Sequence, residues 1–400
     1  MILARLKETL YDKLPLSTKL ALKGLAFRVR RTSTEIGNKP RVLVFDERIP
    51  TPDRDAGSLR MMRILVILRE RWDVIFVPFT NRGERDGVLT KIGVRVADVA
   101  EYRRLLKNPR VRAAIVCRPS MAELFTDRIR RLNPRARIIF DTVDVHFVRL
   151  QREYELTGDP IIRADAERHR EAETRLAREV DAIWCASVDD EGNIREAVGD
   201  CDSVVVSTLH EIHDPGPGFA KRRGLLFVGS FAHRPNADAV TYFLREIFPL
   251  LRERMPDIDF HIVGSDPPEE IKSQASDRVQ VHGFVPDLEP LLASVRVFVA
   301  PLRYGGAGTK GKVGEALAHG IPVACTSIGA EGFGLTSGFD AMIADEPEAF
   351  ADAVANVYSD QTLWEKLSTN GRARIQADFT PAAVSAKILA SIDPNGSISE

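Results

Sequence analysis

A glycine-rich segment between two apolar strands constrains the fold of this chain more than any other stretch. Residues 295–326 read as a strand, a loop, a helix and a second strand, and Gly305, Gly306 and Gly308 lie in the loop. Glycines let a backbone approach a ligand closely, and the N-terminus of the helix presents free N–H groups and a positive dipole end. The segment therefore predicts half of a nucleotide-binding fold with a phosphate-binding loop.

Two familiar nucleotide motifs overlap this loop, and neither is complete. Gly306-x-Gly308-x-x-Gly311 has the dinucleotide-binding spacing, but it comes after several strands instead of in an opening βαβ unit. The spacing from Gly306 to Lys312 resembles a P-loop, but Val313 stands where a Ser or Thr hydroxyl must hold magnesium. A glycine loop that only turns the chain is a further alternative.

A third pattern fits the segment better. Glu315 lies about one and a half turns into the predicted helix, where its carboxylate can accept hydrogen bonds from ribose hydroxyls. With Lys310, Lys312 and the run Glu315–Gly320, the segment resembles the donor-site signature of family 4 glycosyltransferases, which are retaining enzymes. The resemblance covers most of residues 41–392. It implies the α/β fold called GT-B, in which two Rossmann-like domains with parallel sheets face each other across a cleft.

Length and composition agree with two domains. The chain has 400 residues, of which 44% are hydrophobic, and short apolar runs alternate with amphipathic stretches, as in parallel sheets covered by helices. The predicted parts are a basic amphipathic arm and linker (1–40), an N-terminal acceptor domain (41–215), a C-terminal nucleotide-sugar domain (216–378), a helix crossing back to the first domain (379–392) and a tail (393–400). A net charge of −1 gives no reason to expect nucleic acid as a partner.

The first 31 residues differ from the rest of the chain. They hold eight Lys or Arg against Glu8 and Asp12, with no apolar run long enough for a signal peptide or a membrane span. Residues 1–31 are expected either to lie on an anionic membrane surface or to pack on protein, and both alternatives stay open. The four scattered cysteines predict reduced structural thiols. The expected location is the cytoplasm, at the inner membrane face if the arm binds lipid.

In the first domain, Gly57 and Ser58 follow the strand of residues 41–46, at the carboxyl end where open sheets bind ligands. The resemblance implies that they approach the donor diphosphate or the acceptor. Capping of the next helix by Ser58 is the alternative.

A second candidate cluster in this domain holds Asp141, Asp144 and His146, which leave the end of another strand. The resemblance implies that His146 faces the transferred sugar as a catalytic group. The alternative is structural, with Asp141 capping a turn and His146 satisfied in the core. Further on, residues 155–180 predict one charged helical segment with a solvated face.

In the second domain, Gly229 and Ser230 end a strand, and Arg234 is the nearby cation. The resemblance implies that this turn contacts the donor diphosphate, although Ser230 departs from the family pattern, in which basic residues follow the glycine. The resemblance also implies that the backbone of Phe284 and Val285 holds the nucleobase by hydrogen bonds.

Within the glycine-rich segment, the resemblance assigns donor contacts to Gly306, Gly308, Thr309, Lys312 and Glu315. Backbone N–H groups, Lys310 and Arg234 would stabilise the leaving diphosphate in place of a metal, so neither metal nor cofactor is expected. Ala307 replaces the first acid of the paired-glutamate motif of the family, which leaves the identity of the sugar open.

His210 and His213 have a spacing seen in metal sites, but no third ligand is evident nearby, and the prolines and glycines that follow favour a hinge between domains. The predicted function is transfer of a sugar from a nucleotide-sugar donor to a glycan or lipid-linked acceptor, in bacterial surface polysaccharide synthesis. The alternatives are a sugar-nucleotide epimerase and a noncatalytic nucleotide-sugar-binding subunit of a polysaccharide-assembly complex.

Overall fold

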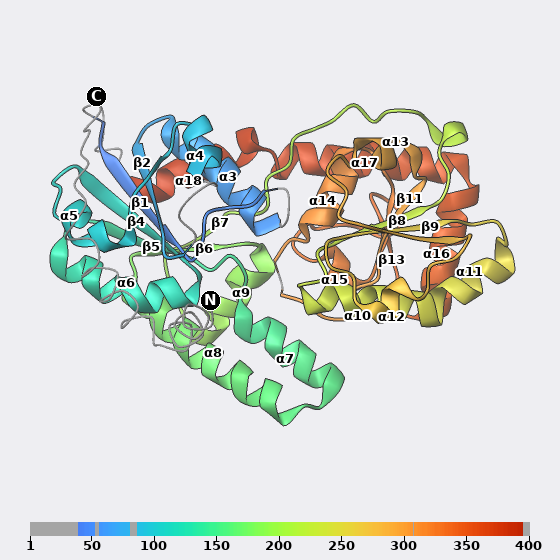
Figure 1. Cartoon of the computed structure of the whole chain (residues 1–400), viewed down its shortest axis with the longest axis horizontal. Coiled ribbons are helices and arrows are strands. Elements are labelled where there is room, and N and C mark those ends of the chain that lie inside the picture. The colour runs from blue at the N-terminus through green and yellow to red at the C-terminus, as the bar shows by residue number, and fades with distance from the viewer. Residues whose placement is uncertain (1–38, 53–55, 81–85, 307, 395–400) are drawn as a thin grey trace, which may run out of the picture.

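A computed structural model of the chain describes residues 39–52, 56–80, 86–306 and 308–394. The basic arm predicted at residues 1–31 lies outside the described residues, as does Ala307. The described chain forms two α/β domains that lie side by side (Figure 1).

The first domain is built on a seven-stranded sheet in the order β3-β2-β1-β4-β5-β6-β7, and every strand pair is parallel. Its strands are β1 (Arg41–Asp46), β2 (Asp73–Pro78), β3 (Arg95–Val96), β4 (Val111–Cys117), β5 (Arg137–Asp141), β6 (Ala182–Cys185) and β7 (Ser203–Val205). Its helices are α3 (Ala56–Arg69), α4 (Asp86–Lys91), α5 (Tyr102–Leu106), α6 (Arg118–Leu132), α7 (His146–Thr157), α8 (Pro160–Glu179) and α9 (Val188–Val198).

The second domain repeats this plan with a six-stranded parallel sheet in the order β10-β9-β8-β11-β12-β13. Its strands are β8 (Leu225–Val228), β9 (Phe260–Val263), β10 (Val279–Gly283), β11 (Val297–Ala300), β12 (Val323–Cys325) and β13 (Met342–Ile343). Its helices are α10 (Arg234–Tyr242), α11 (Phe248–Arg254), α12 (Glu269–Lys272), α13 (Glu289–Ser294), α14 (Gly311–Ala318), α15 (Ser327–Ala330), α16 (Pro347–Ser359) and α17 (Gln361–Asp378). The predicted pair of Rossmann-like domains is therefore confirmed.

Both sheets are buried on both faces, which explains their continuous apolar strands. In β1, Leu43 and Phe45 pack into one core cluster, whereas Val42 and Val44 pack into the cluster on the opposite face. The second sheet divides its side chains between two clusters in the same way. The cysteines Cys117, Cys185 and Cys325 are buried within these layers, and none of the four forms a disulfide.

The last helix, α18 (Pro381–Ile392), leaves the second domain and packs on the first, beside α3 and β7 (Figure 1). Thr380 caps it by accepting a hydrogen bond from the N–H of Ala383, and Ile388 is fully buried in a first-domain core. Ser391 accepts a hydrogen bond of 2.9 Å from the Trp184 indole. The end of the chain therefore ties the two domains together.

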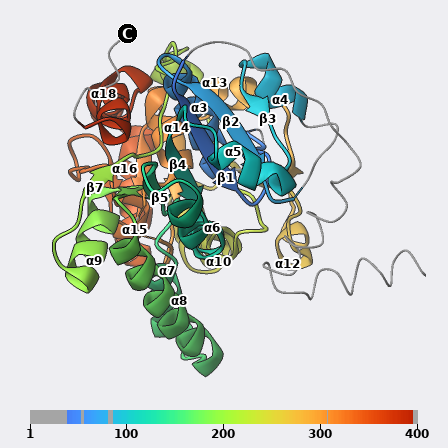
Figure 2. The same ribbon diagram turned by 90° about the vertical axis from the view of Figure 1, so that its left-hand side faces the viewer.

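The charged segment predicted to be helical, residues 155–180, holds the end of one helix and the whole of a second. α7 and α8 run antiparallel and project from the body of the first domain (Figure 2). Gly158, with φ of 69°, ends α7, and Pro160 begins α8. The hairpin is not simply a solvated face, because Glu153 and Glu173 are only 2% and 0% exposed. In the described part of the chain, no helix is long and apolar enough to cross a lipid bilayer.

Candidate active site

The two sheets direct their carboxyl ends toward a shared region, called here the domain junction. In each sheet the strand order reverses next to the first strand of the domain, between β1 and β4 and between β8 and β11. The glycine-rich loop, residues 304–310, leaves the carboxyl end of β11. Open parallel sheets bind ligands at such reversals, so this loop occupies the expected place for a ligand site.

The N-termini of α3 and α14 meet at the junction. A Cβ added to Gly311, the first residue of α14, would lie 2.5 Å from the Cβ of Ala56, the first residue of α3. Gly57 and Ser58 therefore lie in the first turn of α3, and the Ser58 side chain is buried. Two helix N-termini in contact place free N–H groups and two positive dipole ends together, an arrangement suited to an anion.

First-domain carboxylates lie against the glycine loop in this structure. A Cβ on Gly306 would lie 1.6 Å from Asp144 Oδ1, and a Cβ on Gly308 would lie 3.0 Å from Asp190 Oδ2. Arg149 holds Asp144 through a 3.0 Å salt bridge. The glycines predicted to make room for a ligand thus make room here for acidic side chains from the facing domain.

Lys310 folds back on its own loop. Its ammonium donates hydrogen bonds to the carbonyl oxygens of Gly306 and Gly308, the latter at 2.8 Å, and lies 3.3 Å from the Glu331 carboxylate. Burial lowers the pKa of Lys310, and the charge of Glu331 opposes that shift. Lys310 therefore orders the loop as well as supplying a cation.

Lys312 links the glycine loop to the turn that follows β8. Its ammonium donates to Asn236 Oδ1 and lies 4.4 Å from the centre of the Phe227 ring. Asn236 in turn donates to the carbonyl oxygen of Ser230 at 2.8 Å, and its side chain fills the space beside Gly229. Burial and the like charge of Lys310 lower the pKa of Lys312 to about 7.

Glu315 contacts both histidines of the predicted hinge. His210 Nδ1 lies 3.1 Å from Glu315 Oε2, and His213 Nε2 lies 3.5 Å from Glu315 Oε1. Burial works to raise the pKa of Glu315, but the hydrogen bond from His210 and the charges of His210, His319 and Arg63 together outweigh it, and the pKa is lowered. The ring of His210 fits because residue 314 is glycine, where a Cβ would lie 2.2 Å from Nε2.

Thr309 joins the two domains. Its hydroxyl oxygen lies 2.9 Å from that of Thr208 and accepts a hydrogen bond of 3.2 Å from the Thr208 N–H. The Thr208 hydroxyl is also 3.1 Å from His210 Nε2. The predicted donor residue Thr309 thus belongs to the same hydrogen-bonded network as His210 and Glu315.

His146 begins α7 and is anchored by a buried acid on α8. Glu173 accepts hydrogen bonds from the N–H groups of His146 and Phe147, and lies 3.2 Å from His146 Nδ1. Burial disfavours the imidazolium, but Glu173 and the charge of Asp144 outweigh it, so the pKa of His146 is raised. The Asp141 carboxylate is unavailable to a substrate, because it is fully buried and pairs with Arg60 at 2.8 Å.

The remaining predicted site residues lie outside the glycine-rich loop and the helix that follows it. Arg234, at the start of α10, forms an ion pair with the buried Glu153 of α7 across the domain junction. Phe284 and Val285 follow β10; the Phe284 side chain is 46% exposed, and Val285 packs partly against the core. Gly229 and Ser230 lie on the same edge, since Ser230 Oγ is 3.3 Å from Ser265 Oγ after β9.

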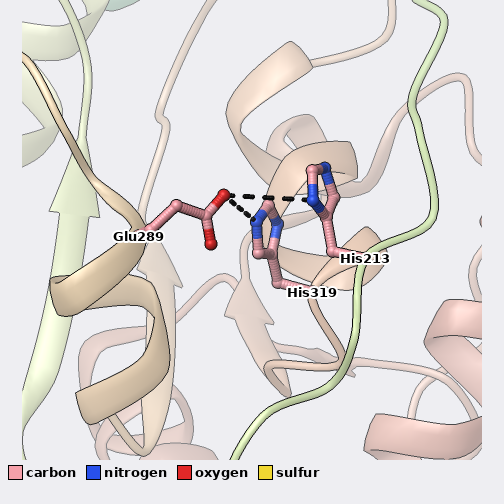
Figure 3. Close-up of side chains that lie close together, drawn as sticks. All are labelled: His213, Glu289 and His319. Carbon is pink, nitrogen blue, oxygen red and sulfur yellow. Dashed lines mark hydrogen bonds and ion pairs between the residues drawn. The ribbon is translucent and has the colours of Figure 1, made fainter.

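His213 belongs to a second small cluster, with Glu289 and His319 (Figure 3). Their possible ligand atoms all lie within 4.8 Å of one another. However, the rings of His213 and His319 stack, with centroids 3.9 Å apart and planes inclined by 12°. Imidazole lone pairs lie in the ring plane, so two rings stacked face to face are not arranged around one tetrahedral ion in this structure.

Two features of the junction were not predicted. Arg152 of α7 forms two hydrogen bonds, of 2.8 and 2.7 Å, with the carboxylate of Glu331 and one of 3.3 Å with the carbonyl oxygen of Gly305. Asp190 of α9 is fully buried beside Gly308. Both residues lie in helices rich in charged residues. Nothing in the local sequence distinguishes them from charged side chains that face solvent.

The comparisons with known proteins concern the family of the second domain and the fold of the chain. Residues 222–360 match the family model of Glycosyl transferases group 1. A lipopolysaccharide core biosynthesis mannosyltransferase of Rhizobium meliloti is 29% identical over 168 residues, which are 38% of this chain and 47% of the relative. An "uncharacterized 44.6 kDa protein in cps region" of Klebsiella pneumoniae is 27% identical over 174 residues, 41% of this chain and 45% of that protein. The matches thus span about half the length of these curated relatives.

Solved structures share the architecture over nearly the whole chain. Anabaena HepE in complex with UDP-glucose superposes with a TM-score of 0.68 at 13% identity, covering 88% of this chain and 99% of that one. TarM superposes with a TM-score of 0.70 at 10% identity, covering 89% and 99%. The fold is therefore GT-B, and with the match of the second domain to the group 1 family it supports a glycosyltransferase.

Proposed function

We propose that the chain is a retaining, metal-independent hexosyltransferase that moves a sugar from a nucleotide-sugar donor to a glycan or lipid-linked acceptor in bacterial surface polysaccharide synthesis. The observation that carries the proposal is the contact between the N-termini of α3 and α14 beside the glycine loop, with Lys310 and Lys312. The relative acting in lipopolysaccharide core biosynthesis supports the polysaccharide context.

In this proposal the donor diphosphate lies at the two helix N-termini. Backbone N–H groups and the two lysines stabilise the charge that develops as the sugar leaves. Glu315 accepts hydrogen bonds from the ribose, replacing contacts that it now makes with His210 and His213. The first domain supplies the acceptor side, where the resemblance places His146 close to the sugar.

Donor entry requires the domains to separate. Asp144 and Asp190 lie against the loop glycines, and two ion pairs, Arg152 with Glu331 and Arg234 with Glu153, cross the junction. Opening would free Arg234 to reach the diphosphate. Closure around the donor would exclude water from the reacting centre.

The test is a thermal-shift screen of the purified protein with UDP, GDP, dTDP and ADP sugars, followed by incubation of the stabilising donor with membrane lipid extract. Transfer that keeps the anomeric configuration, assigned by NMR of the product, is the expected result. Conversion of the donor without an acceptor would indicate an epimerase. Binding without either reaction would indicate a noncatalytic subunit.

A further inference from the structure

Asp190 is a fully buried carboxylate without a hydrogen-bond partner among the described residues. It lies in the first turn of α9, is 0% exposed, and neither of its oxygens is satisfied. The acids on either side are partnered: Asp189 accepts a 3.0 Å hydrogen bond from the N–H of Gly332, and Glu191 accepts one from the hydroxyl of Ser203. Of these three consecutive acids, only Asp190 lacks a hydrogen-bond partner among the described residues.

Capping of α9 does not explain why a carboxylate is buried at position 190. Ser187 caps the helix by accepting a 2.9 Å hydrogen bond from the N–H of Asp190. A Glu or Gln at this position can return a hydrogen bond to the N–H of the capping residue, but the Asp190 oxygens make no such bond. Buried polar groups are nearly always paired, so an unpaired carboxylate that the protein retains is a candidate for ligand contact.

The Asp190 carboxylate lies against the glycine-rich loop. A Cβ on Gly308 would lie 3.0 Å from its Oδ2. Burial and the like charge of Asp144 raise the pKa of Asp190 well above its ordinary value, and Lys310 on the loop opposes that shift. Asp190 therefore stands across the junction from the proposed diphosphate site, where the described residues offer it no hydrogen-bond partner.

The neighbouring groups favour hydroxyls over a cation as its ligand. Asp144 already pairs with Arg149, and Lys310 and Arg152 bring positive charge to the Glu331 side of the loop. Asp144 and Glu331 add negative charge around Asp190, but each is already paired with an arginine. That leaves the two oxygens of Asp190, too few for a divalent ion that takes six to eight oxygen ligands. The same two oxygens suit paired hydroxyl donors, which form short hydrogen bonds to carboxylates.

We propose that Asp190 accepts hydrogen bonds from hydroxyl groups of the sugar carried by the donor, and so selects which sugar is transferred. This inference rests on the proposed function. A site built to bind a hydroxyl strongly rejects analogues that lack it, because its buried polar group is then left unpaired.

The experiment compares wild type, Asp190→Asn, Asp190→Ala and the control Asp189→Asn. Calorimetry measures the dissociation constants of UDP against UDP-glucose and of GDP against GDP-mannose, and thermal unfolding is recorded without ligand. The expected result is at least a tenfold loss of affinity for the bound nucleotide sugar in both Asp190 variants, with less than a threefold change for its nucleoside diphosphate. The unliganded Asp190→Asn protein is expected to unfold at the same or a higher temperature than wild type.

Equal losses for the sugar and its nucleoside diphosphate, unchanged affinity for both, or a lower unfolding temperature of Asp190→Asn would overturn the assignment. A wild-type protein that binds none of the four compounds, nor any dTDP or ADP sugar, would overturn the proposed function together with this inference. The two failures are thus distinguishable from the wild-type data alone.

Discussion

Arg152 and Glu331 form a bidentate salt bridge between the two domains, with N–O distances of 2.8 and 2.7 Å. Arg152 lies on α7, and Glu331 follows α15 and also approaches Lys310 at 3.3 Å. The bridge thus connects the projecting hairpin of the first domain to the residues beside the glycine-rich loop of the second. It is one of the ion pairs that cross the junction, another being Arg234 with Glu153.

Arg152→Ala is expected to shift the protein toward an open arrangement. A partly exposed pair contributes about 1 kcal/mol, which corresponds to about a fivefold change in an equilibrium between open and closed forms. Small-angle scattering of the unliganded protein should show a larger radius of gyration. Arg163→Ala is the control, because Arg163 pairs with Glu167 within α8. Identical scattering from both variants would mean that the bridge does not hold the junction closed.

Gly314→Ala should destabilise the protein. The new Cβ would lie 2.2 Å from the His210 ring, which contacts Thr208 and Glu315 on either side. Overpacking of this kind typically exceeds the gain of about 1 kcal/mol from replacing glycine within a helix, leaving a net loss of about 1–2 kcal/mol. Denaturant unfolding measures it. Gly305→Ala is the control, because its nearest neighbour would be 3.8 Å away, and comparable stability of the two variants would argue against this packing.

Lys310→Ala should lower the rate of sugar transfer about a hundredfold, since removing one group that stabilises the leaving charge typically costs about 3 kcal/mol. The variant also loses the hydrogen bonds to Gly306 and Gly308, so donor affinity is measured alongside the rate. The exposed Lys272→Ala serves as control. Undiminished turnover of the Lys310 variant would remove this lysine from the proposed mechanism.

Binding of a nucleoside diphosphate should weaken as pH rises through neutrality. The pKa of Lys312 is lowered to about 7, so its side chain is an ammonium below pH 7. Above pH 7 the side chain is neutral, and part of the binding free energy of the anion is spent on protonating it. The dissociation constant should rise by up to about tenfold per pH unit above 7, with proton uptake visible by calorimetry in two buffers. Lys312→Arg keeps its charge and should show no such dependence. An equally steep pH profile in that variant would assign the effect to another group.

Much of the fold was predictable because parallel strands buried on both faces leave continuous apolar runs. Residues 41–46 form β1 as expected, and the predicted strand, glycine loop and helix of the donor segment all form. The two-residue strand β13, Met342–Ile343, is too short to leave such a run. The break between α7 and α8 was missed, although Gly158 and Pro160 mark it, because the charge pattern continues through both helices.

For the candidate site, the sequence could group only residues that lie near one another in the chain. The glycine loop, Lys310, Lys312 and Glu315 are local to one segment, and the structure groups them at the junction. Asp190 was missed because Ser187-x-x-Asp190 reads as an ordinary helix start. Its lack of a partner among the described residues depends on its surroundings at the facing domain, which no local pattern encodes.

The most direct test of the nucleotide site is calorimetry with a nucleoside diphosphate and with inorganic pyrophosphate, on wild type, Glu315→Gln and the control Glu289→Gln. Glu289 contacts the same histidine cluster through His319 at 3.1 Å, and it has no proposed role with the donor. We predict that wild type binds one of UDP, GDP, dTDP or ADP, that Glu315→Gln weakens this binding at least tenfold, and that pyrophosphate affinity is unchanged. No binding of any nucleotide to wild type, or equal affinity in Glu315→Gln, would contradict a donor site at the glycine loop.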